Sequence, residues 1–198
     1  LLGSYYTWVR KTEYNEIKKK MEEDTANSMS KKKKDKEVSL PPILSFDAIF
    51  IPDDAKTAAQ IAPYLPYYDA RDVVLLGPNT WNSPQLVSRG GENVEGALFV
   101  DGFSGNPKFE EGKTFIRNFK NVFNSVPGVL EAQAYDGANI LINTIKKGSE
   151  TRDSLKNSIS GSGTFIGATG KISFSNDGET EKELFVLGVE RGKIVLKE

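Results

Sequence analysis

The residues best suited to bind a small molecule follow apolar runs of strand length. Adjacent carboxylates stand at Asp53 and Asp54, directly after the apolar run at 46–51. A loop at 79–82 follows the apolar run at 73–76 and combines neutral hydrogen-bonding side chains with an indole ring. The candidate ligand-binding residues, which include the flanks of two further expected strands, are Tyr6, Asp53, Asp54, Asn79, Thr80, Trp81, Asn82 and Phe103.

Several of these residues also have a purely structural interpretation. Asp53 and Asp54 precede a helical pattern, and a carboxylate in that position commonly caps the first turn of a helix. Trp81 is as consistent with a core residue as with the wall of a ligand site. The sequence leaves both interpretations open.

The residue types that the chain lacks exclude much enzyme chemistry. None of its 198 residues is His or Cys, so Ser-His-Asp and Cys-His nucleophiles, thiol redox sites and the usual zinc sites are ruled out. The carboxylate pair at 53–54 has no second acidic cluster to complete a hydrolase pair or an oxygen cage for a cation. We therefore expect no enzymatic activity, no catalytic residue, no cofactor and no metal site.

Charge and hydropathy narrow the range of partners. The chain has 26 basic and 27 acidic side chains, and this net charge of −1 argues against broad binding to nucleic acid or to an anionic membrane. No apolar stretch approaches the roughly 18 residues that a transmembrane helix needs. A transmembrane segment is therefore not expected in this chain.

The first half of the chain has the pattern of a Rossmann-like parallel sheet flanked by helices. Apolar runs at 46–51, 73–76 and 96–103 alternate with helical patterns, and Ser83-Pro84 is typical of a helix start. A strand at 1–7, a helix from Thr12 and an exposed, mobile Lys-rich loop at 25–40 are expected before them. In such a sheet, ligands bind outside the carboxyl ends of the strands, where the candidate residues would meet.

The second half has a different pattern. Helices are expected near 115–123, 134–145 and 151–159, followed by strands at 171–174, 183–190 and 193–196. The helices are amphipathic, but this region offers almost no strands for their apolar faces to cover. The missing sheet would have to come from elsewhere.

Four segments resemble a known family in their order and spacing. They are FDAIFIPDDAKTAAQIAPYLPYYD at 46–69, VVLLGPNTWNSPQLVSRGGENVEGALFVDGF at 73–103, AQAYDGANILINTIKKG at 132–148 and FIGATGKISFSNDGE at 165–179. They are similar to the type I periplasmic binding proteins, the superfamily of the leucine/isoleucine/valine-binding proteins. The resemblance is strongest to the branch of ABC-transporter substrate-binding proteins that includes the penicillin-binding protein activators.

The resemblance implies an α/β fold of two Rossmann-like lobes, of which this chain is the C-terminal part. Residues 1–100 would form most of the second lobe, 101–165 would be helices of the first lobe, and 166–198 would return as strands to the second. The sheet of the first lobe would come from preceding sequence. An exported protein, periplasmic or associated with the outer membrane, is implied, and a lipoprotein is one form it could take.

The resemblance also implies a function in binding. The expected protein is a non-enzymatic receptor or sensor that closes two lobes on a small molecule, amino acid or amide-like, with a membrane permease as partner. The alternative is a regulator of peptidoglycan synthases that acts by protein contact. Amino-acid-binding members carry an acidic residue after the third strand, where this chain has Asn79, and this difference favours a neutral ligand.

Overall fold

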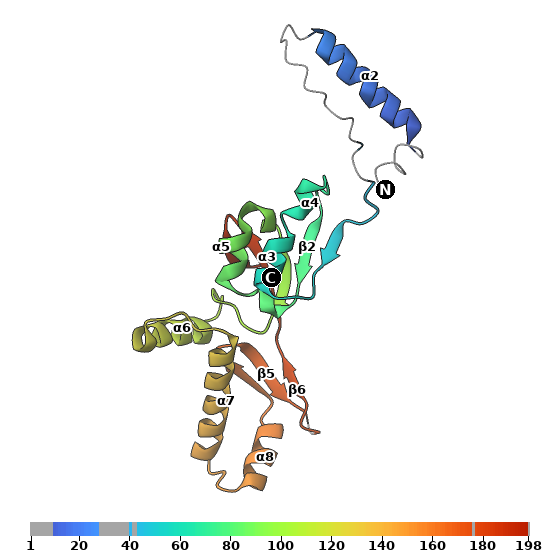
Figure 1. The fold of residues 1–198 in the computed structure, drawn as a ribbon. Coiled ribbons are helices and arrows are strands. Elements are labelled where there is room, and N and C mark those ends of the chain that lie inside the picture. Colours follow the sequence, from blue (N-terminus) through green and yellow to red (C-terminus); the bar gives the residue numbers. More distant parts are fainter. Residues whose placement is uncertain (1–9, 28–39, 41–42, 176, 198) are drawn as a thin grey trace.

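The computed structural model describes residues 10–27, 40, 43–175 and 177–197 (Figure 1). Its first element is helix α2 (Lys11–Asn27), with Tyr14, Ile17 and Met21 at the spacing of one helical face. This helix confirms the one expected from Thr12, and it includes the first residues of the expected Lys-rich loop. The rest of that loop, apart from Leu40, and the expected strand at 1–7 lie outside the described residues.

A five-stranded sheet organises the first half of the chain. Its order is β1 (Ala48–Phe50), β2 (Val74–Gly77), β3 (Leu98–Asp101), β7 (Phe185–Glu190) and β8 (Lys193–Leu196). The strands β1, β2 and β3 are parallel, whereas β7 and β8 are antiparallel to their neighbours. The three parallel strands and the C-terminal hairpin confirm the elements expected from the apolar runs.

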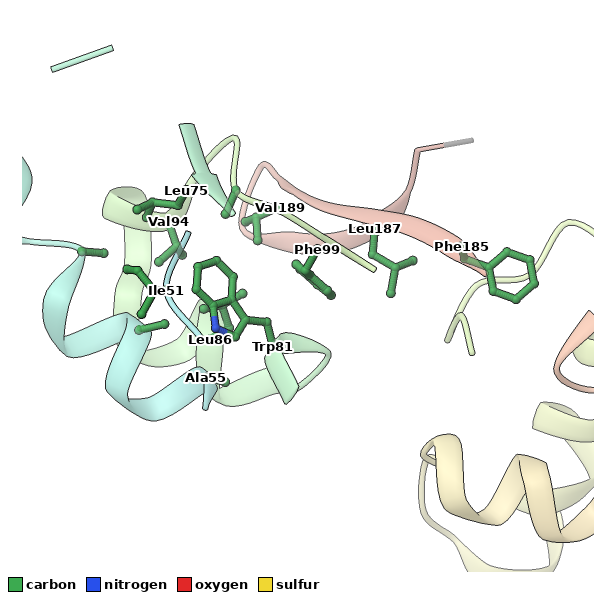
Figure 2. Packing of buried hydrophobic residues seen from close by; sticks show 13 residues of the cluster. Ile51, Ala55, Leu75, Trp81, Leu86, Val94, Phe99, Phe185, Leu187 and Val189 are labelled. Carbon is green, nitrogen blue, oxygen red and sulfur yellow. The ribbon is translucent and has the colours of Figure 1, made fainter. Parts of the chain in front are cut away.

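Helices cover one face of this sheet. They are α3 (Ala55–Ile61) and α5 (Pro84–Gly90), with the short helices α4 (Tyr64–Tyr67), η1 (Asn79–Trp81) and η2 (Gly91–Val94) between strands. Figure 2 shows the Trp81 indole in this core, near Ile51 and Leu86. We call the five-stranded sheet with these helices the sheet unit.

Local signals set the ends of both covering helices. The side chain of Asp54 caps α3 by accepting a hydrogen bond from the Thr57 N–H, and Ser83 caps α5 by accepting one from the Gln85 N–H. Pro84 occupies the first turn of α5, where its missing N–H costs no hydrogen bond. Pro63 lies just after α3, and the chain continues as α4.

The opposite face of the sheet is apolar and largely exposed. Alternate residues of four strands point to it: Phe50, Val74, Val100 and Val186 are between 39% and 58% exposed. A sheet of this kind normally carries helices on both faces. Within the described ranges only one face has them, so this part of the chain forms a half-covered sheet.

Residues 110–182, together with Phe103 from the segment after β3, form a second unit. Helices α6 (Glu110–Phe123), α7 (Val129–Lys146) and α8 (Arg152–Ser160) precede an antiparallel sheet of β4 (Thr164–Gly167), β5 (Gly170–Phe174) and β6 (Thr180–Lys182). Its core contains Phe103, Phe115, Ile116, Ala132 and Ala168. We call it the helical unit, and Figure 1 shows it below the sheet unit.

The helical unit corrects the expected division of the chain. Helices alone were expected at 101–165, but β4 begins at Thr164, and β4 and β5 contact α6 and α8 respectively. The chain returns to the five-stranded sheet only at β7, so the boundary expected at residue 166 lies after Lys182. Even so, apolar side chains of α6 and α7 such as Phe123, Leu130 and Ile142 remain 47% to 74% exposed.

Candidate functional site

The loops after β1 and β2 are joined by a single carbonyl group. The Asp53 carbonyl oxygen accepts a hydrogen bond of 2.9 Å from the Thr80 hydroxyl and one of 3.0 Å from the Trp81 indole N–H. Because η1 follows β2 directly, these bonds hold its first turn beside the end of β1. The carboxyl ends of the two strands therefore form one continuous edge.

Asn82 joins the same edge to the end of β3. Its amide Nδ2 donates to the Asp101 carboxylate at 2.7 Å and to the Phe103 carbonyl at 3.0 Å. The Asp101 carboxylate also accepts a hydrogen bond of 2.6 Å from the Gly102 N–H. Asn82 is thus a positioning residue, and three loops that are separate in sequence are brought together as expected.

Two of the expected ligand-binding residues are core residues in this structure. Trp81 is fully buried in the sheet unit, and Gly77 leaves room for it, because a Cβ atom there would lie 2.0 Å from the indole ring. Phe103 is 2% exposed and packs edge to face on Phe115 in the helical unit. Contact of either ring with a solute would require it to leave this packing.

The adjacent carboxylates have different surroundings. Asp54 accepts the Thr57 N–H at 2.7 Å, and this bond holds the pKa of its carboxyl below the usual value. The structural interpretation of Asp54 as a helix cap is therefore confirmed. Asp53 accepts the Asp54 N–H with one oxygen at 2.7 Å and remains exposed at the edge.

The exposed polar groups of the edge are few. Asn79, Thr80 and Asp53 are exposed, and Asn82 is partly buried between the strands. Tyr6, the remaining candidate, lies outside the described residues. The edge therefore presents one amide, one hydroxyl and two carboxylates, of which that of Asp54 caps α3.

Asp101 is an acidic residue of the edge that was not among the candidates. It is 3% exposed, and burial raises the pKa of its carboxyl, although the bonds from Asn82 and Gly102 and the charge of Lys182 oppose this shift. Its signal in the sequence is a single charged residue inside an apolar strand run. Such a residue is costly to bury unless it is paired.

The raised pKa of Asp101 predicts a pH dependence of stability. The folded pKa of Asp101 lies above the unfolded value of about 3.8, so the folded state binds the proton more tightly. Ionisation of Asp101 therefore destabilises the fold as the pH rises from the unfolded pKa through the folded pKa. We expect wild type to lose stability relative to Asp101→Asn as the pH rises from about 3.8 through the raised pKa of the folded state, measured by urea unfolding. A difference that stays constant, or that changes in the opposite direction, would contradict the buried carboxylate.

Other parts of the described chain offer little chemistry. No group of three or more acidic side chains suitable for a metal ion occurs in the described residues. A groove of about 430 Å³ lies away from the edge, in the helical unit, where Glu111, Asn139 and Phe165 contribute to its walls. The edge at β1, β2 and β3 is therefore the candidate site because of its topology rather than its depth.

Comparison with known proteins agrees with this topology. Residues 47–193 match the periplasmic binding protein family. A leucine-binding protein from Thermotoga maritima is 27% identical, with a TM-score of 0.63 over 77% of this chain and 44% of that one. A branched-chain amino acid substrate-binding protein from Streptococcus pneumoniae, solved with isoleucine, is 25% identical, with a TM-score of 0.61 over 78% and 46%.

A further solved structure shows the same fold at lower identity. A putative branched-chain amino acid ABC transporter protein from Rhodospirillum rubrum is 23% identical, with a TM-score of 0.71 over 76% of this chain and 44% of that one. No match was found among curated protein sequences.

The fold is thus that of a type I periplasmic binding protein, present in part. The chain belongs to the periplasmic binding protein family. It spans less than half the length of the solved relatives described above.

Proposed function

We propose that this chain is part of a non-enzymatic solute receptor that holds a small molecule between the carboxyl edge of β1, β2 and β3 and the facing unit. The observation that carries the proposal is the position of this edge beside the junction of the two units. Asp101 ends β3 in the sheet unit, and Phe103, two residues later, is buried in the core of the helical unit. A molecule bound at the edge would therefore be enclosed or released when the angle between the two units changes.

The connections between the units suit such a change. The chain leaves the sheet unit after β3 and returns between β6 and β7, and neither connecting segment, 102–109 nor 183–184, contains a helix or strand. Hinge closure around a ligand commonly uses a few residues at the ends of regular elements. Two such segments side by side would form a hinge.

The exposed side chains favour a neutral, polar ligand. Asn79 offers both donors and an acceptor, and the Thr80 hydroxyl, which donates to the Asp53 carbonyl, retains acceptor capacity. The position that is acidic in the amino-acid-binding proteins this chain resembles is Asn79 here, so an ammonium group would find no carboxylate at that point. Asp53 could still accept an N–H or O–H group of the ligand.

Family membership supports a cellular location and a partner for this receptor. Relatives described as substrate-binding proteins of ABC transporters support an exported, periplasmic protein with a membrane permease as partner. Within the described ranges, no helix combines the length and apolarity needed to cross a bilayer. The partner would supply the passage through the membrane.

A ligand screen tests the receptor proposal. The full-length protein would be heated with amino acids, amides, sugars, aromatic acids and peptidoglycan fragments. One solute class should raise the melting temperature progressively with its concentration, and at a hundredfold excess over Kd the added stability should be about 2.7 kcal/mol. If no class shifts the melting temperature and the protein instead binds a peptidoglycan synthase, the receptor proposal fails.

A matched pair of variants locates the binding site. Asn79→Ala should weaken binding of the identified solute about tenfold, as expected for loss of one or two hydrogen bonds. Gln60→Ala removes an exposed amide near the C-terminal end of α3, whose opposite end lies at the edge, and should leave the affinity unchanged. Equal affinity in Asn79→Ala and wild type would place the solute elsewhere.

A further inference from the structure

Both connections between the two units meet at one aromatic ring, that of Phe185. This residue begins β7 and pairs with Asp101, the last residue of β3, so it lies where the chain leaves the sheet unit and where it returns. Its side chain is 6% exposed and belongs to the core of the sheet unit. The sheet unit therefore fixes the position of the ring at the junction.

The first connection contacts this ring through Phe109, its last residue. The ring centroids of Phe109 and Phe185 lie 6.1 Å apart, with an angle of 20° between the ring planes, which is a stacked arrangement. Phe109 directly precedes α6 and packs against Gly112, where an added Cβ atom would lie 2.8 Å from its ring. A tilt of α6 relative to the sheet unit would therefore disturb the stacking.

The second connection is shorter and is held at both ends. The Glu183 carboxylate accepts the Lys171 N–H at 3.0 Å, and the Glu183 N–H donates to the Lys171 carbonyl oxygen at 3.0 Å, so Glu183 stays with β5. Phe185 contacts the start of the same strand, because a Cβ atom on Gly170 would lie 2.9 Å from the Cζ atom of the ring. Only Leu184, which is 64% exposed, stands between Glu183 and Phe185. Rotation between the units at this connection is thus confined to the immediate neighbourhood of the ring.

We propose that Phe185 is the pivot of the junction, a positioning residue whose ring sets the relative orientation of the two units through its contacts with Phe109 and Gly170. The surface at Gly170 is itself fixed, because Asp136 on α7 accepts hydrogen bonds from the N–H and the hydroxyl of the preceding residue, Thr169. Closely packed side chains resist continuous deformation. The units are therefore limited to rotations that keep the ring in contact with both neighbours, with or without a bound solute.

Distances between spin labels test the proposal on the full chain. Because the sequence contains no Cys, Ser88→Cys on α5 and Asn157→Cys on α8 would place one label on each unit. Pulsed dipolar spectroscopy should give a distance distribution that becomes about twofold wider in Phe109→Ala, because a connection that loses its stacked partner gains freedom to move. Phe109→Tyr keeps the ring and should retain the wild-type distribution.

Further variants separate the pivot from a general loosening of the fold. Phe185→Leu keeps an apolar side chain on β7 but removes the ring, and it should also widen the distribution. Adding Phe109→Ala to Phe185→Leu should widen it no further, because the stacking is already lost. Phe174→Leu is the matched control: Phe174 is partly buried like Phe109, but its ring partner, 6.2 Å away, is Phe165 of the same unit, and the distribution should not change. An unchanged distribution in folded Phe109→Ala, further widening in the double variant, or equal widening in Phe174→Leu would overturn the proposal.

Discussion

Trp81→Ala is expected to lower the free energy of unfolding by about 3–5 kcal/mol, the range for truncating a large buried aromatic side chain. The indole is fully buried, its ring centroid lies 6.3 Å from that of Phe99, and its N–H donates to the Asp53 carbonyl. The variant would leave a cavity in the sheet unit and remove one of the two hydrogen bonds that the Asp53 carbonyl oxygen accepts. Urea unfolding followed by far-UV circular dichroism measures the loss.

Two comparisons make this prediction specific to burial. Tyr67 is 75% exposed on α4, so Tyr67→Ala should change stability by no more than about 0.5 kcal/mol. Gly77→Ala should also destabilise, because its Cβ would overlap the indole ring, and this cost should be smaller when Trp81→Ala is already present. A loss below about 1 kcal/mol for Trp81→Ala would mean that the indole is not a core residue, and would restore its interpretation as a ligand wall.

Asp136→Ala is expected to lower the free energy of unfolding by about 3 kcal/mol or more, because it leaves three buried donors without a partner. The carboxylate fixes the turn between β4 and β5 to α7 through Ala168 and Thr169. The fit is close, because a Cβ atom on Gly167 would lie 2.3 Å from the Asp136 carboxylate. The loss should appear in the helical unit, and amide hydrogen exchange of β4 and β5 would locate it.

Control variants distinguish the bonded carboxylate from negative charge in general. Asp153 is exposed in the first turn of α8, so Asp153→Ala should cost about 0.5 kcal/mol at most through the helix dipole. Thr169→Val removes only the hydroxyl donor and should cost about 1 kcal/mol. If Asp136→Ala and Asp153→Ala had equal effects, the three bonds would contribute nothing to stability.

Local sequence signals were sufficient for much of the fold. The apolar runs at 46–51, 73–76 and 96–103 predicted β1, β2 and β3, because parallel strands buried in a sheet need continuous apolar side chains. Ser83-Pro84 correctly predicted the start of α5, since a cap depends only on residues within one turn. Strands β4 and β6 were missed. The short β6, Thr-Glu-Lys, has no apolar pattern and exists because it pairs with β5.

The candidate site, like the fold, was predicted from the sequence only in part. Its place at the carboxyl edge of three strands followed from the strand order, because loops after parallel strands meet at one edge. The burial of Trp81 and Phe103 did not follow, since an aromatic ring in a loop can face either a solute or a core. The sequence by itself therefore determined the α/β class, the caps, the exclusion of His and Cys chemistry and the family resemblance.

Only the tertiary structure decided which polar groups meet. Asp136 on α7 accepts hydrogen bonds from Ala168 and Thr169, which lie 32 and 33 residues further along the chain, and no local pattern connects them. They meet because the chain turns back after α8, so that the turn between β4 and β5 lies against α7. Burial and charge pairing depend on everything that surrounds a side chain, whereas strand and cap signals depend on its neighbours along the chain.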